Sequence, residues 1–168
     1  MQLSMYQASI PLFVRMLENM SVILDKAAAQ AEAKKIDQSI FVNARLAPDM
    51  YPLSRQIQIA TDMAKGCCAR LAGIDVPSYE DNETSIEELQ ARIAKTTAFL
   101  RGISAEQIDG SEEKPISLRT HNHELNFLGQ PYLLHFVYPN FYFHLTTAYA
   151  ILRHNGVELG KLDFVGAY

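Results

Sequence analysis

The sequence predicts an all-α protein, a four-helix bundle with long crossover connections and a short hairpin before the last helix. Four long segments repeat their apolar residues at helical spacing, and glycine, proline and capping residues mark their ends. The connections between these segments are too long for simple turns between neighbouring helices. With 168 residues, the chain has the length of one domain, residues 1–168.

The first two helices are defined by apolar stripes and by the residues at their ends. The first is expected over residues 9–34, with Ser9 as its cap and Pro11 in its first turn, where a missing amide hydrogen costs nothing. Residues 36–50 are irregular but apolar, and we expect them to pack across the bundle. The second helix is expected over residues 52–73. Its apolar positions have the spacing of a bundle seam: Leu53, Ile57, Ala60, Ala64, Cys67 and Leu71.

The third helix and the segment after it have clear local signals. Thr84 and Glu87 have the spacing of a capping box, so the third helix is expected to begin at Thr84 and to run to Gly102. Residues 114–129 then alternate apolar and polar positions, which predicts a short hairpin or extended excursion.

The fourth helix, residues 131–155, is apolar around most of its circumference, which is typical of a buried helix. Pro139 is expected to bend or interrupt it. One face nevertheless carries polar side chains, including Asn140, His144 and Thr147. An unpaired polar group in a core costs roughly 1–3 kcal/mol, so these groups need partners. The pattern predicts either a binding site or a set of core hydrogen bonds.

The composition excludes some classes of partner. The net charge is −4, from 15 basic and 19 acidic residues, so we expect no nucleic-acid partner. Residues 131–152 carry no formal charge, but their prolines and histidines favour a buried helix over a membrane span. The two cysteines, Cys67 and Cys68, are adjacent and cannot form an ordinary disulfide. They predict core thiols in a cytoplasmic protein.

The second helix offers polar groups that could join those of the fourth. Gln58 and Asp62 are one turn apart and lie on one side of the helix. If that side faces Asn140 and His144, the core holds a carboxylate, two amides and an imidazole. Asp62 would then raise the pKa of His144. The predicted ligand-binding residues are therefore Gln58, Asp62, Asn140 and His144.

A metal site is harder to build from the histidines. His144 and His154 are ten residues apart, about 15 Å along a helix axis, which is too far to share one ion. His121 and His123 share one face of an expected strand and, with Glu124, make a weak candidate for a surface metal contact. We therefore predict no metal and no other cofactor.

The segment PNFYFHLTTAYAILRHNGVELGKLDF resembles the last helix of the DinB/YfiT-like superfamily. Its tail matches at Leu152, Arg153, Gly156 and Val157, and His144 stands at the offset of the family's last metal histidine. The segments RLAPDMYPLSRQIQIATDMAKG, ARLAGIDVP and ELQARI extend the resemblance to nearly the whole chain. They are similar to an uncharacterised bacterial family in that superfamily, a domain of unknown function. The resemblance implies a DinB-like bundle and a homodimer.

Better-known members of the superfamily hold a divalent metal with one histidine from the second helix and two, four apart, from the last. Some are hydrolases or thiol-dependent transferases. Here the residue four before His144 is Asn140. The second helix offers Gln56, Gln58 and Asp62 but no histidine. The chain therefore looks like a member that lacks the ordinary three-histidine site.

Three hypotheses on function follow. The sequence does not discriminate between an enzyme and a binding protein. The first, which we prefer, is a polar pocket in the bundle core that binds a small ligand without a metal. The second is a metal-dependent hydrolase or thiol transferase whose atypical site includes His144, Asp62 and His135. The third is a structural or interaction homodimer with no open site.

Overall fold

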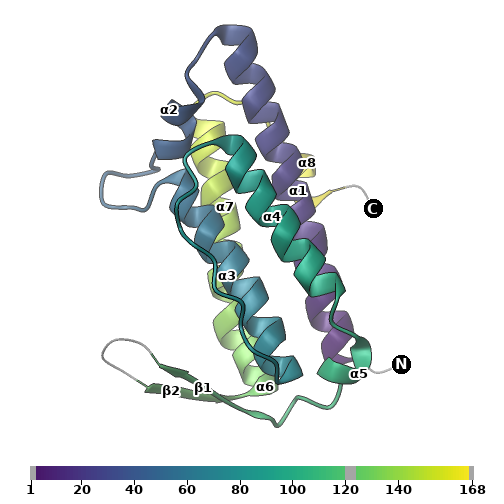
Figure 1. Ribbon diagram of the computed structural model, residues 1–168. Helices are drawn as coiled ribbons and strands as arrows, with labels where there is room; N and C mark the ends of the chain where they lie inside the picture. The colour runs from purple at the N-terminus through teal and green to yellow at the C-terminus, as the bar shows by residue number, and fades with distance from the viewer. Residues whose placement is uncertain (1–2, 120–123, 167–168) are drawn as a thin grey trace.

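The computed structural model describes residues 3–119 and 124–166 and is mostly helical. The long helices that lie side by side in Figure 1 are α1 (Met5–Lys34), α3 (Leu53–Ala72), α4 (Ile86–Arg101) and α7 (Tyr138–His154). An antiparallel hairpin of β1 (Pro115–Arg119) and β2 (Glu124–Leu128) precedes the last of them. The predicted helical fold and the short hairpin are confirmed. His121 and His123, the candidates for a surface metal contact, lie outside the described residues.

Helix α1 begins a turn earlier than the sequence analysis predicts. Ser4 is its cap, because its Oγ accepts a hydrogen bond from the Gln7 amide nitrogen at 3.2 Å, and the Gln7 side chain accepts one from the Ser4 nitrogen. The prediction that Ser9 is the cap is wrong. The Ser9 hydroxyl is buried and donates to the Met5 carbonyl at 2.7 Å, and Pro11 lies inside the helix.

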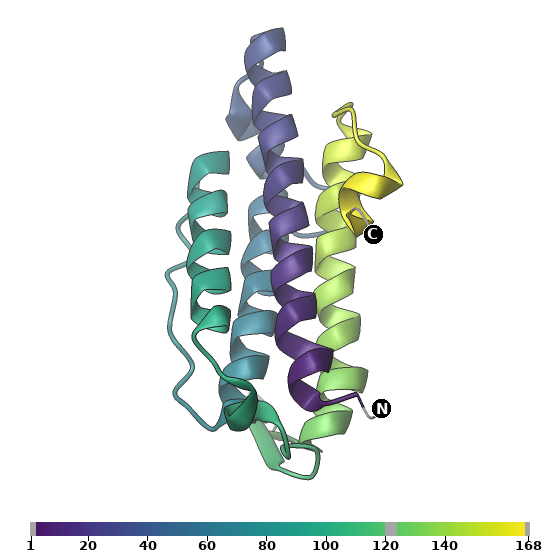
Figure 2. The same cartoon turned by 90° about the vertical axis from the view of Figure 1, so that its right-hand side faces the viewer.

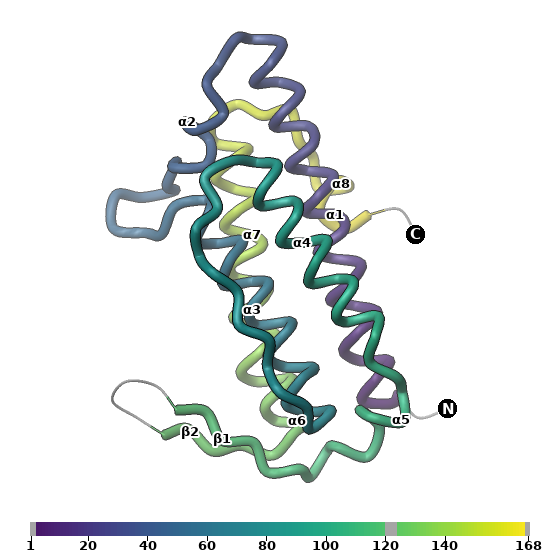
Figure 3. Tube along the Cα trace, viewed as in Figure 1, coloured from purple at the N-terminus to yellow at the C-terminus, as the bar shows by residue number. Residues whose placement is uncertain are grey.

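Helix α3 has the predicted extent, and Gly73 ends it with a left-handed backbone (φ 73°) that glycine adopts without strain. Helices α3 and α4 run in the same direction, so the chain must return along their length between them (Figure 1). Residues 74–85 make this return, and we call them the strap. The tube trace in Figure 3 shows the strap following α3 back toward the start of α4. Extended, its 12 residues reach about 40 Å, whereas α4 is about 24 Å long.

The cap of α4 lies one residue later than predicted. The Ser85 Oγ accepts from the Glu88 amide nitrogen at 3.1 Å, and the Glu88 carboxylate accepts from the Ser85 nitrogen at 3.1 Å. The predicted box of Thr84 and Glu87 is therefore wrong. Thr84 instead donates its hydroxyl to the same Glu88 carboxylate at 3.0 Å.

The predicted interruption of the last helix is present. A short turn, α6 (Gly129–Pro131), leads into a π-helix, η1 (Tyr132–Val137), and then into α7. Pro139 has no amide hydrogen for the carbonyl four residues earlier, and its ring crowds that carbonyl. The π-helix leads directly into α7, whose first turn contains Pro139.

The core lies between the long helices. Phe13 of α1 and Phe141 of α7 meet edge to face with their ring centroids 4.8 Å apart. The predicted core thiols Cys67 and Cys68 are buried and free, and burial raises the pKa of Cys67 well above its usual value. None of the helices in the described ranges has the length and apolar character needed to cross a membrane.

Shorter helices close the ends of the fold. Residues expected to be irregular include α2 (Gln38–Asn43), which buries Phe41 and Val42. Helix α5 (Ala105–Ile108) follows α4. Helix α8 (Lys161–Val165) lies beside α1, as Figure 2 shows, and the Asn19 side chain donates to the Phe164 carbonyl at 3.0 Å.

Candidate functional site

The structure pairs His144 of α7 with Gln56 of α3, and 2.7 Å separates the imidazole Nδ1 from the amide Oε1. Helices α3 and α7 are neighbours, and Gln56 is buried between them. The Gln56 Nε2 donates to the Tyr51 carbonyl at 3.0 Å, which fixes the orientation of the amide and turns its oxygen to the imidazole. Because this oxygen can only accept, Nδ1 carries the hydrogen.

The electrostatics around His144 favour a neutral imidazole. Partial burial lowers the pKa of His144 from its ordinary value of 6.5, and the positive charge of Arg55 lowers it further. The sequence-based expectation that Asp62 raises this pKa is therefore wrong. In a neutral imidazole whose Nδ1 donates, Nε2 carries the lone pair and can accept a hydrogen bond from a ligand.

Asn140 lies one turn before His144 on the same helix and is half-buried. Its amide nitrogen donates to the Phe136 carbonyl at 2.7 Å, within the segment that contains the π turn. Thr147, the next polar residue along this face, likewise donates to the Phe143 carbonyl at 2.7 Å. Part of the polar face of α7 is thus satisfied by its own backbone.

Gln58 and Asp62, the other predicted site residues, make their hydrogen bonds elsewhere. The Gln58 Nε2 donates to Glu83 of the strap at 2.9 Å, and its Oε1 accepts from Arg55 at 3.2 Å. Asp62 accepts from Arg92 at 2.9 Å. The structure therefore does not gather the four predicted residues at one point.

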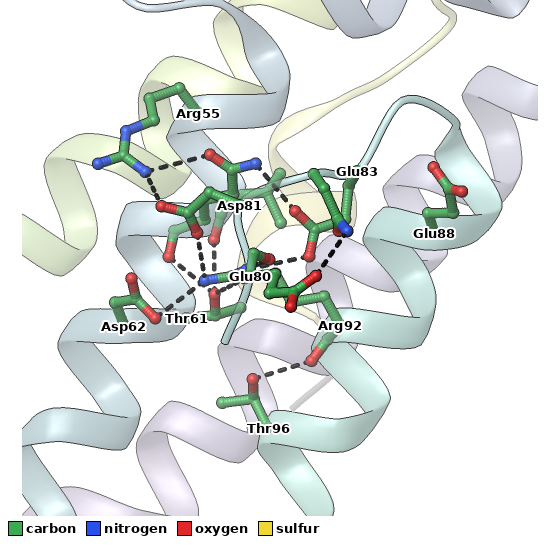
Figure 4. Close-up of polar contacts among 12 residues, drawn as sticks. Arg55, Thr61, Asp62, Glu80, Asp81, Glu83, Glu88, Arg92 and Thr96 are labelled. Atoms are coloured by element: carbon green, nitrogen blue, oxygen red, sulfur yellow. Dashed lines mark hydrogen bonds and ion pairs between the residues drawn. The ribbon is translucent and has the colours of Figure 1, made fainter. Parts of the chain in front are cut away.

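Arg92 of α4 is the centre of this second polar cluster, shown in Figure 4. Its side chain is 2% exposed. It donates to Thr61 Oγ1 at 2.8 Å and to the Glu80 carbonyl at 3.0 Å, and it forms ion pairs with Asp62, Asp81 and Glu83 at 2.9 to 3.1 Å. These acceptors offset the cost of burying the positive charge of the guanidinium. Through them, Arg92 joins the strap to both α3 and α4.

An aromatic ring of the strap lies in the same cluster. The Nζ atoms of Lys65 and Lys95 are 3.7 and 4.2 Å from the centroid of the Tyr79 ring, and the guanidinium of Arg92 is 5.3 Å from it. These are cation–π distances. Burial raises the pKa of the Tyr79 hydroxyl above its ordinary value of 10.

The donor set at His144 does not fit the metal site that the resemblance implies. The residue four before His144 is Asn140, the α3 side chain in contact with the imidazole is Gln56, and amides are poor zinc ligands. Asp62, proposed as an alternative ligand, instead pairs with Arg92 and with Lys65, at 2.9 Å each. Over residues 3–119 and 124–166, no three histidine, cysteine or carboxylate side chains are grouped to hold an ion.

Two residues at the centre of these clusters, Gln56 and Arg92, are missing from the residues predicted from the sequence. Each has a positional signal. Gln56 lies three residues after Leu53 and four before Ala60, so it occupies the apolar seam of α3. Arg92 lies three residues after Leu89, in the seam of α4. A polar side chain in a seam must be paired.

Comparison with solved structures gives a close match. The chain is 42% identical to a DinB family member protein from Shewanella denitrificans, whose crystal structure superposes with a TM-score of 0.87. The match covers 97% of this chain and 92% of that one. Among curated proteins the comparison finds no match. The fold is thus that of a DinB family protein.

The family follows from a second comparison. The model of a family described as a domain of unknown function (DUF1993) matches residues 5–165. The chain belongs to this family. Neither comparison states an activity, so the function has to be argued from the two polar clusters.

Proposed function

We propose that the protein is a DinB-like four-helix bundle that binds a small polar ligand at His144, without the three-histidine metal site. The observation that carries this proposal is the 2.7 Å hydrogen bond from His144 Nδ1 to Gln56 Oε1. It fixes the ring and leaves Nε2 as an acceptor on a neutral, half-buried imidazole.

The chemistry around the ring narrows the class of ligand. A hydroxyl or amine of the ligand would donate to His144 Nε2. Arg55 is near enough to lower the pKa of His144, so a negatively charged group on the ligand would be attracted to the same place. Gln58 supports this role indirectly, because its Oε1 accepts from Arg55 at 3.2 Å. The proposed ligand is a small anion that also carries a hydrogen-bond donor, such as a hydroxy acid. Direct binding roles for Asp62 and Asn140 stay predictions.

A screen of small hydroxy and amino acids against the ¹⁵N-labelled protein tests the proposal. We expect amide shifts around His144 and Gln56 for at least one compound, lost in His144→Ala. His154→Ala is the matched control, since His154 is on the same helix but exposed at its end. Equal binding to His144→Ala and to the wild type would contradict the proposal.

A second candidate function, a homodimer, is favoured by the outer face of α7. Phe143 is 55% exposed and Leu46 is 40% exposed, and both line a shallow hollow of about 390 Å³ with Tyr142 and Ala150. Residues 131–152 carry no formal charge, so two copies could meet there without like-charge repulsion. Sedimentation equilibrium tests this: we expect a dimer that Phe143→Glu converts to a monomer, and a monomeric wild type would overturn it.

A further inference from the structure

The strap, residues 74–85, is an acidic peptide within the chain. It contains Asp75, Glu80, Asp81 and Glu83 and no lysine or arginine. Three of these carboxyl-bearing residues, at positions 80, 81 and 83, lie around Arg92 in Figure 4.

The helix face beneath the strap has the opposite charge. Its cations are Arg55 and Lys65 of α3 and Arg92 and Lys95 of α4. Two strap carboxylates, those of Asp81 and Glu83, pair with these cations, whereas the Glu80 carboxylate accepts from Asn82 of the strap at 3.0 Å. Glu83 and Asp81 lie 2.9 and 3.1 Å from the Arg92 guanidinium, and Asp81 also pairs with Arg55.

The strap is held by these side chains and not by a backbone ladder. Within the described part of the chain, residues 75–84 make no backbone-to-backbone hydrogen bond. Asp81 is 38% exposed on its side chain, so part of the contact faces water. An open hollow of about 500 Å³ lies along the strap and α4, lined in part by Tyr79, Arg92 and Lys95. The strap is therefore held through charged and aromatic side-chain contacts, with an open surface hollow beside it.

We propose that the α3–α4 face beneath the strap is a docking surface for an acidic, tyrosine-containing peptide segment of a partner protein, and that the strap occupies it in cis. The argument is charge complementarity together with the Tyr79 ring, which two lysines and an arginine approach. A partner segment with the same chemistry would displace the strap and make the same contacts. Because the strap is tethered, its high effective concentration keeps the face occupied until the cis contact is weakened.

A fluorescein-labelled peptide, IDVPSYEDNETS, tests the proposal in trans by fluorescence anisotropy at low ionic strength, against the full chain. The strap-weakened variant is the double substitution Asp81→Asn and Glu83→Gln, which lowers the cis charge and leaves the helix cations in place. We expect this variant to bind the peptide at least tenfold more tightly than the wild type does. Circular dichroism establishes that the variant is folded. If it does not fold, Tyr79→Ala, which keeps every strap charge, takes its place.

Two control peptides make the outcome decisive. One replaces the tyrosine at position 79 with alanine, and the other contains the same residues in scrambled order. The proposal requires weaker binding of both. A folded strap-weakened variant that binds the peptide no more tightly than the wild type would overturn the proposal. Equal binding of the scrambled peptide would also overturn it, because the binding would then depend on net charge alone.

Discussion

The imidazole of His144 and the amide of Gln56 meet at 2.7 Å although they are 88 residues apart in the chain. This contact joins α3 to α7 and decides which ring nitrogen of His144 is protonated. It also puts an amide, a poor zinc ligand, against the imidazole. The site is therefore described better by the chemistry of a neutral imidazole than by that of a metal centre.

The stability of the protein should depend on the charge state of His144. Since the folded-state pKa of His144 is below its ordinary value of 6.5, the unfolded chain binds the proton more readily. Stability is then greatest above that value and is lost as the pH falls from it through the folded-state pKa. We expect urea denaturation of the wild type and of His144→Gln to give a difference in unfolding free energy that shrinks as the pH is lowered over this window.

The control for this effect is His154→Gln, on the same helix but exposed. The difference in unfolding free energy between His154→Gln and the wild type should not shrink as the pH is lowered. A His144→Gln difference that stays constant from neutral pH to about pH 5 would mean that the imidazole is not held neutral by its surroundings.

Loss of Arg92 should destabilise the fold strongly. Arg92→Ala leaves Glu83, 10% exposed, without a cation, while Asp62 and Asp81 each lose one of two cations and keep Lys65 and Arg55. Breaking a buried ion pair costs about 3–5 kcal/mol, and we expect the lower end because Asp62 and Asp81 are 39% and 38% exposed.

Arg101→Ala is the matched control for Arg92→Ala, measured by chemical denaturation. Arg101 is also on α4 and also pairs with a carboxylate, that of Glu18, but the two side chains are 57% and 50% exposed. Arg101→Ala should lower the unfolding free energy by less than about 1 kcal/mol. Similar losses for the two variants would show that the Arg92 cluster is no stronger than a surface pair.

The cap of α4 can be located by mutation. Ser85→Ala removes the Oγ that accepts from the Glu88 nitrogen and should cost about 1 kcal/mol of unfolding free energy. Glu87→Ala should change the unfolding free energy by no more than about 0.5 kcal/mol, as for an ordinary exposed position. A larger loss of unfolding free energy for Glu87→Ala than for Ser85→Ala would instead support the capping box of Thr84 and Glu87 predicted from the sequence.

Gly129 should be intolerant of any side chain. A Cβ at this position would lie 1.9 Å from the Ser111 carbonyl oxygen and 3.1 Å from Leu71 Cδ2. The backbone around the start of α6 would have to move, and we expect Gly129→Ala to cost about 1–3 kcal/mol or more by thermal or chemical unfolding. Gly160→Ala is the control, because nothing lies within 4 Å of its Cβ position. Equal stability of the two variants would contradict this account.

The sequence predicts the long helices well where a single signal marks each boundary. Gly73 can end α3 without strain, and Pro139 interrupts the last helix, so both features are predicted from local chemistry. The cap of α4 is missed because two candidates are adjacent. In T-S-I-E-E, both Thr84 and Ser85 have a glutamate three residues later, and only the folded backbone selects Ser85.

The site is predicted less completely because it depends on the rotation of α3. Gln56 and Gln58 are two residues apart and face different neighbours, Gln56 toward α7 and Gln58 toward the strap. The seam position of Gln56 carries a signal for this. The partners of Arg92 carry none, because Asp81 and Glu83 come from an irregular segment whose path the hydrophobic pattern does not determine.

The most direct test of the central claim is a long-range ¹H–¹⁵N correlation spectrum of the histidine side chains, recorded across pH with and without one equivalent of Zn²⁺. For His144 the account predicts a neutral ring protonated at Nδ1, a pKa below 6.5, and signals that zinc leaves unchanged. A stoichiometric shift of the His144 nitrogens on adding zinc, or a ring protonated at Nε2, would contradict it and restore the metal-dependent alternative.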